Sequence, residues 1–104
     1  MNIGIEKNMT TWFVTRHPGA IAWMKKQPVA VDRWVSHLDA DEIREGDTVI
    51  GILPLHAAAK VCEKGAIFLA LSIELTEEQR GRELSLQDLE NISCSLRRFD
   101  VRAL

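Results

Sequence analysis

Four apolar runs alternate with amphipathic segments along this chain. The runs occupy residues 12–15, 29–38, 48–53 and 66–75. The run at 48–53 is almost continuously apolar, which is typical of a central parallel strand that is covered on both faces. The pattern therefore predicts four strands, separated by helices or turns.

Two of the apolar runs lead into a proline that suits the start of a helix. Pro18 and Pro54 follow the first and third runs, and proline fits the first helical turn because the N–H that it lacks would have no partner there. We expect one helix from Pro18 to about residue 27, ended by Pro28. A second is expected over residues 55–64, with Gly65 at the position of a C-terminal cap.

A third helix is predicted near the C-terminus, after a polar linker over residues 76–84. Ser85 is a suitable N-cap. Apolar residues then recur at helical spacing along one stripe: Leu86, Leu89, Ile92, Leu96 and Phe99.

Strands that alternate with helices indicate parallel pairing through right-handed crossovers. The predicted fold class is therefore α/β: a small Rossmann-like open parallel sheet of about four strands, in the order 2-1-3-4, with helices on both faces. At 104 residues the chain is long enough for one core. We expect a single domain over residues 11–104 and a flexible N-terminal extension over residues 1–10. Exposed edges of so small a sheet favour a homodimer.

Composition and charge narrow the expected partners. The formal net charge of −2 argues against duplex DNA, which usually requires a basic domain. A small anion is compatible with this charge because a few convergent arginines suffice to hold it. No apolar run approaches the roughly 20 residues of a membrane span, and residues 1–11 lack a signal-peptide pattern. We therefore expect a cytoplasmic protein with no membrane partner.

Motifs for metals and common cofactors are absent from the sequence. The chain has neither CxxC nor HExxH, and the spacing of its three histidines matches no local metal motif. It also lacks GxGxxG and the P-loop pattern. We expect no metal and no cofactor. Cys62 and Cys94 are expected to be reduced, buried thiols.

Candidate functional residues follow the ends of the predicted strands. The carboxyl ends of parallel strands share one rim, where open α/β sheets bind ligands. The helix N-terminus after Pro18 would add unpaired amides for an anion, and a glycine beside it leaves room for a ligand. The rim residues are Arg16 and His17 after the first strand, Gly19 in the helix turn, Ser36 and His37 after the second strand, and His56 after the third.

Each candidate also has an ordinary structural interpretation. Arg16 could pair with a carboxylate such as Asp39. His17 could only cap the helix, His37 could be a structural residue at a strand end, and His56 could be a solvated residue of the first helical turn. These alternatives stay open at the level of the sequence.

Other residues could reach a ligand from outside the rim. Arg80 and Arg82 belong to a basic turn that is either a solvated loop or an arm over a phosphodiester ligand. Trp12 and Trp34 are expected in the core or an interface. Trp23, on the first helix, could instead stack on a base or pack against a partner subunit.

Six blocks of sequence, in this order, resemble a small family of CRISPR-associated proteins. They are residues 12–20 (WFVTRHPGA), 31–33 (VDR), 37–39 (HLD), 46–51 (GDTVIG), 53–56 (LPLH) and 80–84 (RGREL). The family comprises accessory proteins of type III systems, in the Csx series. The resemblance implies a CARF-like variant of the Rossmann-like fold.

The resemblance also implies a function. The family looks like a ring nuclease that cuts the second messenger cyclic tetra-adenylate to linear di-adenylate. The two-fold axis of such a ring also fits a homodimer that holds the ligand at its two-fold interface. Two alternatives are a non-catalytic binder of the messenger and a module that binds another CRISPR protein. The resemblance implies that five residues face the ligand: Arg16, His17, His56, Arg80 and Arg82. Among these, Arg16, His17 and His56 are the candidates for catalysis without metal, through phosphate stabilisation and proton transfer.

Overall fold

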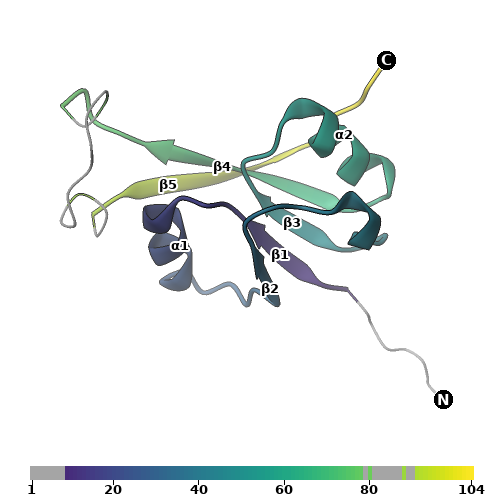
Figure 1. The fold of residues 1–104 in the computed structure, drawn as a ribbon, viewed down its shortest axis with the longest axis horizontal. Helices are drawn as coiled ribbons and strands as arrows, with labels where there is room; N and C mark the ends of the chain where they lie inside the picture. The colour runs from purple at the N-terminus through teal and green to yellow at the C-terminus, as the bar shows by residue number, and fades with distance from the viewer. Residues whose placement is uncertain (1–8, 79, 81–87, 89–90) are drawn as a thin grey trace.

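The computed structural model describes residues 9–78, 80, 88 and 91–104, and within them five strands form one sheet in the order β2-β1-β3-β4-β5 (Figure 1). The strands are β1 (Thr11–Val14), β2 (Arg33–Val35), β3 (Thr48–Gly51), β4 (Ile67–Glu74) and β5 (Ser93–Phe99). Strands β1 to β4 are parallel, and β5 is antiparallel to β4. The predicted α/β class, the small Rossmann-like sheet and the order of its first four strands are confirmed.

Helices cover both faces of the sheet, as predicted. The helical elements are α1 (Pro18–Lys25), the short 3₁₀ helix η1 (Ala40–Glu42) and α2 (Leu55–Glu63). Because successive strand residues point to opposite faces, Trp12 packs in a cluster with the α2 residues Ala58 and Val61. Phe13 packs on the other face with Met24 of α1. Figure 1 shows α1 and α2 on opposite sides of the strands.

The predicted C-terminal helix is wrong over residues 93–99, which form β5. Residues 81–87 and 89–90 of that prediction lie outside the described residues. Cys94 and Leu96 pack towards α1, whereas the intervening Ser95 is exposed. Ile92 and Leu96 are four residues apart, so the same apolar positions satisfy both a helical period and a strand period of two. Pairing with β4 selects the strand.

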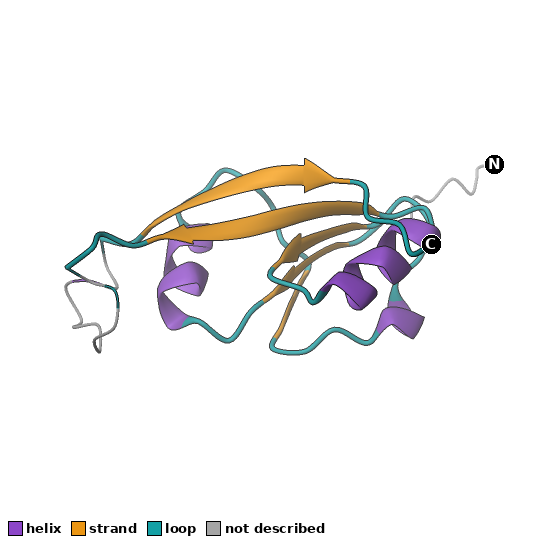
Figure 2. Cartoon of the chain, turned by 90° about the horizontal axis from the view of Figure 1, so that it is seen from above, coloured by secondary structure: helices purple, strands orange, loops and turns teal. Residues whose placement is uncertain are grey.

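Strand β4 extends past its parallel neighbour and changes the rim. Gly51, the last residue of β3, lies opposite Ala70 of β4. Residues 71–74 continue beyond that point opposite β5, and the two strands project as an arm (Figure 2). Leu71 and Ile73 of this arm pack in the cluster of α1. The rim therefore consists of the ends of β1, β2 and β3.

Gly51 allows β1 and β3 to approach closely at the rim. A Cβ atom at this position would clash with the backbone carbonyl oxygen of Val14, its partner in the register. Backbone atoms cannot move aside as a flexible side chain can, so glycine is the residue that fits. The ends of the two strands are thereby held together just before the chain leaves β1.

The described part of the N-terminal segment is joined to the sheet. The Thr10 N–H donates to Asp47 Oδ1 at 2.9 Å, and the Thr48 N–H donates to the Thr10 carbonyl at 3.0 Å. Residues 1–8 lie outside the described residues, so the expected extension stays a prediction. Among the helices that the structure describes, none has the length and apolar character needed to cross a membrane.

Candidate functional site

Arg16 and His37 come together where β1 and β2 end. The Thr15 N–H donates to the Val35 carbonyl at 3.1 Å, which continues the pairing of the strands by one residue. The chain then leaves the sheet at both strands, and Arg16 Nη2 contacts His37 Nε2 and lies 3.4 Å from its Nδ1. The structure thus brings together two of the predicted rim residues.

The Arg16–His37 contact leaves the positive charge of the arginine without a neutralising carboxylate in the pair. A guanidinium only donates hydrogen bonds, so the imidazole nitrogen that it contacts must act as an acceptor and carry no proton. The alternative partner, Asp39, instead accepts from the Asp41 N–H at 3.0 Å and caps η1. Both Arg16 and His37 are exposed. Arg16 is therefore available to an anion.

A cavity of about 460 Å³ lies beside this contact, on the face of the sheet that α1 covers. We call it the Arg16 cavity. Among the residues that the structure describes, its lining contains two cationic side chains and no carboxylate. The lining residues are Phe13, Thr15, Arg16, Ile21, Lys25, Trp34, Val35 and Ser36. This excess of positive charge is the feature that an anionic ligand would require.

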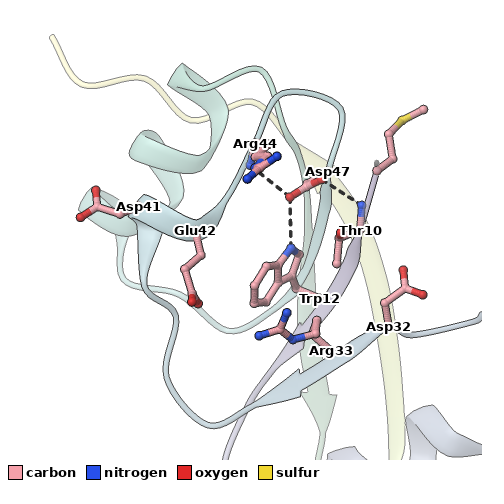
Figure 3. Close-up of a pocket in the computed structure, with 9 residues that line it drawn as sticks. Thr10, Trp12, Asp32, Arg33, Asp41, Glu42, Arg44 and Asp47 are labelled. Atoms are coloured by element: carbon pink, nitrogen blue, oxygen red, sulfur yellow. Dashed lines mark hydrogen bonds between the residues drawn. The ribbon is translucent and has the colours of Figure 1, made fainter. Parts of the chain in front are cut away.

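A second cavity, of about 800 Å³, has the opposite charge balance (Figure 3). It lies at the amino ends of the strands, where four carboxylates outnumber two arginines. Asp47 is buried at its back and accepts from the Trp12 indole N–H at 3.2 Å and the Arg44 N–H at 3.1 Å, besides the Thr10 N–H. The other carboxylates are Asp32, Asp41 and Glu42. This cavity disfavours a phosphodiester, and Asp47 acts there as a structural acceptor.

His56 lines a third cavity, of about 530 Å³, between α2 and the C-terminal tail. The carboxylates Glu63 and Asp100 line it as well, and Arg102 is paired with Asp100 at 3.0 Å. His56 is exposed in the first turn of α2, whose N-cap is Pro54 with no side-chain hydrogen bond. The structure therefore does not place His56 among the residues of the Arg16 cavity.

His17 caps α1 with its side chain. Its Nδ1 accepts from the Gly19 N–H at 3.1 Å and the Ala20 N–H at 3.3 Å, and its own N–H donates to Thr15 Oγ1 at 3.1 Å. The prediction of unpaired amides at this helix N-terminus is wrong for Gly19 and Ala20, because the imidazole already satisfies both. Nδ1 must be unprotonated to accept, so a neutral His17 carries its proton on Nε2.

Replacing His17 by alanine should lower the free energy of unfolding by about 1 kcal/mol, the usual value of an N-cap. His17→Asn keeps a side-chain acceptor at the cap and should recover most of that loss. Chemical denaturation of the three proteins measures the difference. Equal stability of the two variants would show that the cap contributes nothing.

The remaining residues that were predicted to bind the ligand lie in different parts of the structure. Gly19 is buried in the first turn of α1, and Ser36 is exposed and lines the Arg16 cavity. Arg80 is exposed beyond the end of β4. Arg82 lies outside the described residues.

Lys25 and Trp34 are cavity residues that the sequence analysis missed. Trp34 was expected in the core or an interface, but 42% of its surface is exposed, compared with 4% for Trp12. Lys25 Nζ lies 5.6 Å from the centroid of the Trp34 ring. The signal for Lys25 was its position four residues after Ile21, which places both on one face of α1.

Neither cysteine is fully buried, which corrects the prediction of two buried thiols. Both are free and half-buried. Cys62 Sγ accepts from the Val101 N–H at 3.4 Å, so it holds the C-terminal tail against α2. Burial raises the pKa of the Cys94 thiol, and the negative charge of Glu74 raises it further. Cys94 is therefore a poor nucleophile.

Comparison with known proteins identifies a family. The family model described as "Putative CRISPR-associated protein (Cas_VVA1548)" matches residues 12–102. No curated protein and no solved structure matches the chain significantly. The matched range covers β2 to β5, α1, α2, all of β1 except its first residue, and the residues that line the Arg16 cavity. The chain belongs to this family of CRISPR-associated proteins.

Proposed function

We propose that this protein is a ring nuclease of type III CRISPR defence, which cleaves cyclic tetra-adenylate to linear di-adenylate and so ends the antiviral signal. Membership of a CRISPR-associated family supports the biological setting. The observation that carries the proposal is the Arg16 cavity. Its described lining has two cations and no carboxylate, and an imidazole adjoins it at the carboxyl ends of parallel strands.

The reaction requires no metal or cofactor in this proposal. The 2′-hydroxyl of one nucleotide attacks the adjacent phosphorus, the bond from phosphorus to the 5′-oxygen breaks, and a 2′,3′-cyclic phosphate forms. One proton leaves the hydroxyl and one reaches the 5′-oxygen, so no water is consumed. Two such cleavages convert one ring into two molecules of linear di-adenylate. The protein must align the two oxygens and stabilise the charge that develops on the phosphate.

Arg16 is the residue proposed to hold the scissile phosphate. A phosphate at its guanidinium would take the position of the His37 ring as hydrogen-bond acceptor. His37 would then be released beside the phosphate with a nitrogen able to take or give a proton. His17, which precedes α1 next to Arg16, is the second candidate through Nε2. His56 lines a different cavity, and His56→Ala tests whether it takes part.

The proposed assembly is a homodimer. Cyclic tetra-adenylate can adopt two-fold symmetry, so two chains related by a two-fold axis can present identical rims to it. Each chain would then contribute one Arg16 and one Lys25. The dimer doubles the few cations that a single rim offers.

Multiple turnover separates an enzyme from a binder. Purified protein with a large excess of cyclic tetra-adenylate, in the presence of EDTA, is expected to consume many rings per dimer. Chromatography of the nucleotides measures this. His17→Asn, which keeps the helix cap, should slow cleavage more than it weakens binding if His17 gives the proton. A ring that stays intact with the wild-type protein contradicts the proposal.

The second candidate function is a non-catalytic binder that sequesters the messenger. The observation that favours it is that both nearby imidazoles already have partners: His17 Nδ1 bonds the amides of α1, and His37 contacts Arg16. In that case the protein would bind the ring tightly and leave it intact. Absence of any binding would instead indicate a module that recognises another CRISPR protein.

A further inference from the structure

Trp34 lines the Arg16 cavity with a partly exposed indole ring, and the buried ring of Phe13 packs against it. Trp34 is on β2, directly opposite Phe13 of β1 in the parallel register. The two rings meet edge to face, with centroids 5.3 Å apart and an angle of 65° between their planes. Phe13 is 1% exposed, so it is a rigid support. Trp34 still has 42% of its surface exposed, which leaves a flat aromatic surface open to a ligand.

The cations of the cavity lie next to this aromatic surface. Lys25 is the last residue of α1, and its Nζ lies 5.6 Å from the centroid of the Trp34 ring. Arg16 lines the same cavity from the end of β1. Aromatic and cationic groups in one cavity match a nucleotide, whose base stacks on a ring while its phosphate meets a positive charge.

The rest of the lining also suits a base. Ile21 and Val35 are apolar, and Thr15 and Ser36 supply hydroxyl groups that can donate or accept. The volume of about 460 Å³ falls within the range of pockets that bind small ligands. The cavity therefore has room for one nucleotide and the chemical groups to hold each part of it.

We propose that the Arg16 cavity is a nucleotide subsite in which Trp34 stacks on a purine base and Lys25 and Arg16 hold the flanking phosphates. When the base stacks on Trp34, the ammonium group of Lys25 moves off the face of the ring and contacts the phosphate instead. That the base is the adenine of a cyclic oligoadenylate rests on the proposed function. The preference for a purine does not depend on the proposed function. It follows from the cavity alone, since a purine stacks on the Trp34 ring over a larger area than a pyrimidine does.

The subsite can be tested with adenosine monophosphate, independently of any ring. Nuclear magnetic resonance on the wild-type protein resolves the indole N–H signals of its three tryptophans. The signal that disappears in Trp34→Phe is assigned to Trp34. Adenosine monophosphate at millimolar concentration is expected to shift the Trp34 signal and leave that of the buried Trp12 unchanged. Uridine monophosphate should shift it less, and inorganic phosphate least.

Variants then link the subsite to the ring. Trp34→Leu is expected to weaken the binding of cyclic tetra-adenylate by about 5- to 150-fold for each base that stacks on a Trp34 of the dimer. Trp34→Phe should keep most of the affinity because a ring face remains. Lys25→Ala should weaken binding, and its neighbour Lys26, which is exposed outside the cavity, provides the matched control Lys26→Ala.

The outcomes distinguish the subsite from the proposed function. If adenosine monophosphate shifts the Trp34 signal but the wild-type protein neither binds nor cleaves the ring, the subsite stands and the proposed function fails. If the ring is bound with wild-type affinity by Trp34→Leu, and adenosine monophosphate leaves the Trp34 signal in place, the subsite is overturned while ring cleavage can stand.

Discussion

Arg16→Ala is expected to slow the cleavage of cyclic tetra-adenylate by about 10²–10³-fold, the usual loss when one group that stabilises transition-state charge is removed. The guanidinium contacts an imidazole, His37, and not a carboxylate, and the described lining of its cavity contains no carboxylate, so its charge is available to the phosphate. Cleavage rates at saturating ring measure the effect. Ring affinity should fall by a smaller factor, because the charge on the phosphate grows in the transition state.

Arg33→Ala is the matched control for this prediction. It removes the same charge from the neighbouring strand, but Arg33 lies over the Trp12 ring, with Cζ 4.9 Å from its centroid, and lines the acidic cavity. Its cleavage rate should stay close to that of the wild type. Equal losses in Arg16→Ala and Arg33→Ala would mean that only the overall charge matters, which would remove Arg16 from the site.

Asp47→Ala is expected to lower the free energy of unfolding by about 1–3 kcal/mol, since it leaves the buried indole N–H of Trp12 without an acceptor. Asp47 is 1% exposed and accepts from the Thr10 N–H, the Trp12 indole N–H and the Arg44 N–H (Figure 3). These bonds join β1 to the loop before β3. For a domain of this size, the melting temperature should fall by roughly 4–24 °C.

Thermal and denaturant unfolding measure the stability of the Asp47 variants. Asp47→Asn keeps one carbonyl acceptor and should lose less than Asp47→Ala. Glu42→Ala, at an exposed carboxylate that lines the same cavity, is the matched control and should change stability by less than about 0.5 kcal/mol. A loss below about 1 kcal/mol for Asp47→Ala would contradict the structural role of this carboxylate.

The parallel part of the fold could be predicted because local signals agreed there. The run at 48–53, the prolines at positions 18 and 54, and Gly65 each indicated the element that the structure has. Strand β5 could not be predicted, since Ile92 and Leu96 satisfy both helical and strand spacing. The free edge of β4, which is a tertiary feature, decides between them.

The sequence could predict only those residues of the site that directly follow a strand. Arg16 and His37 follow parallel neighbours, so their meeting was predictable from the order of the strands. The separation of His56 was not, because it depends on which face α2 covers. Trp34 and Lys25 join the cavity through the packing of α1 across the β1–β2 edge, which no local pattern encodes.

The most direct test of the proposed function is the chemistry of the product. Wild-type protein, EDTA and cyclic tetra-adenylate are incubated in water labelled with heavy oxygen, and the products formed at early times are analysed by mass spectrometry. We expect linear di-adenylate that ends in a 2′,3′-cyclic phosphate and contains no heavy oxygen, because the attacking oxygen comes from the substrate. A product that has gained heavy oxygen at the cleaved phosphate, or a ring that stays intact, would contradict a nuclease that uses the 2′-hydroxyl of its own substrate.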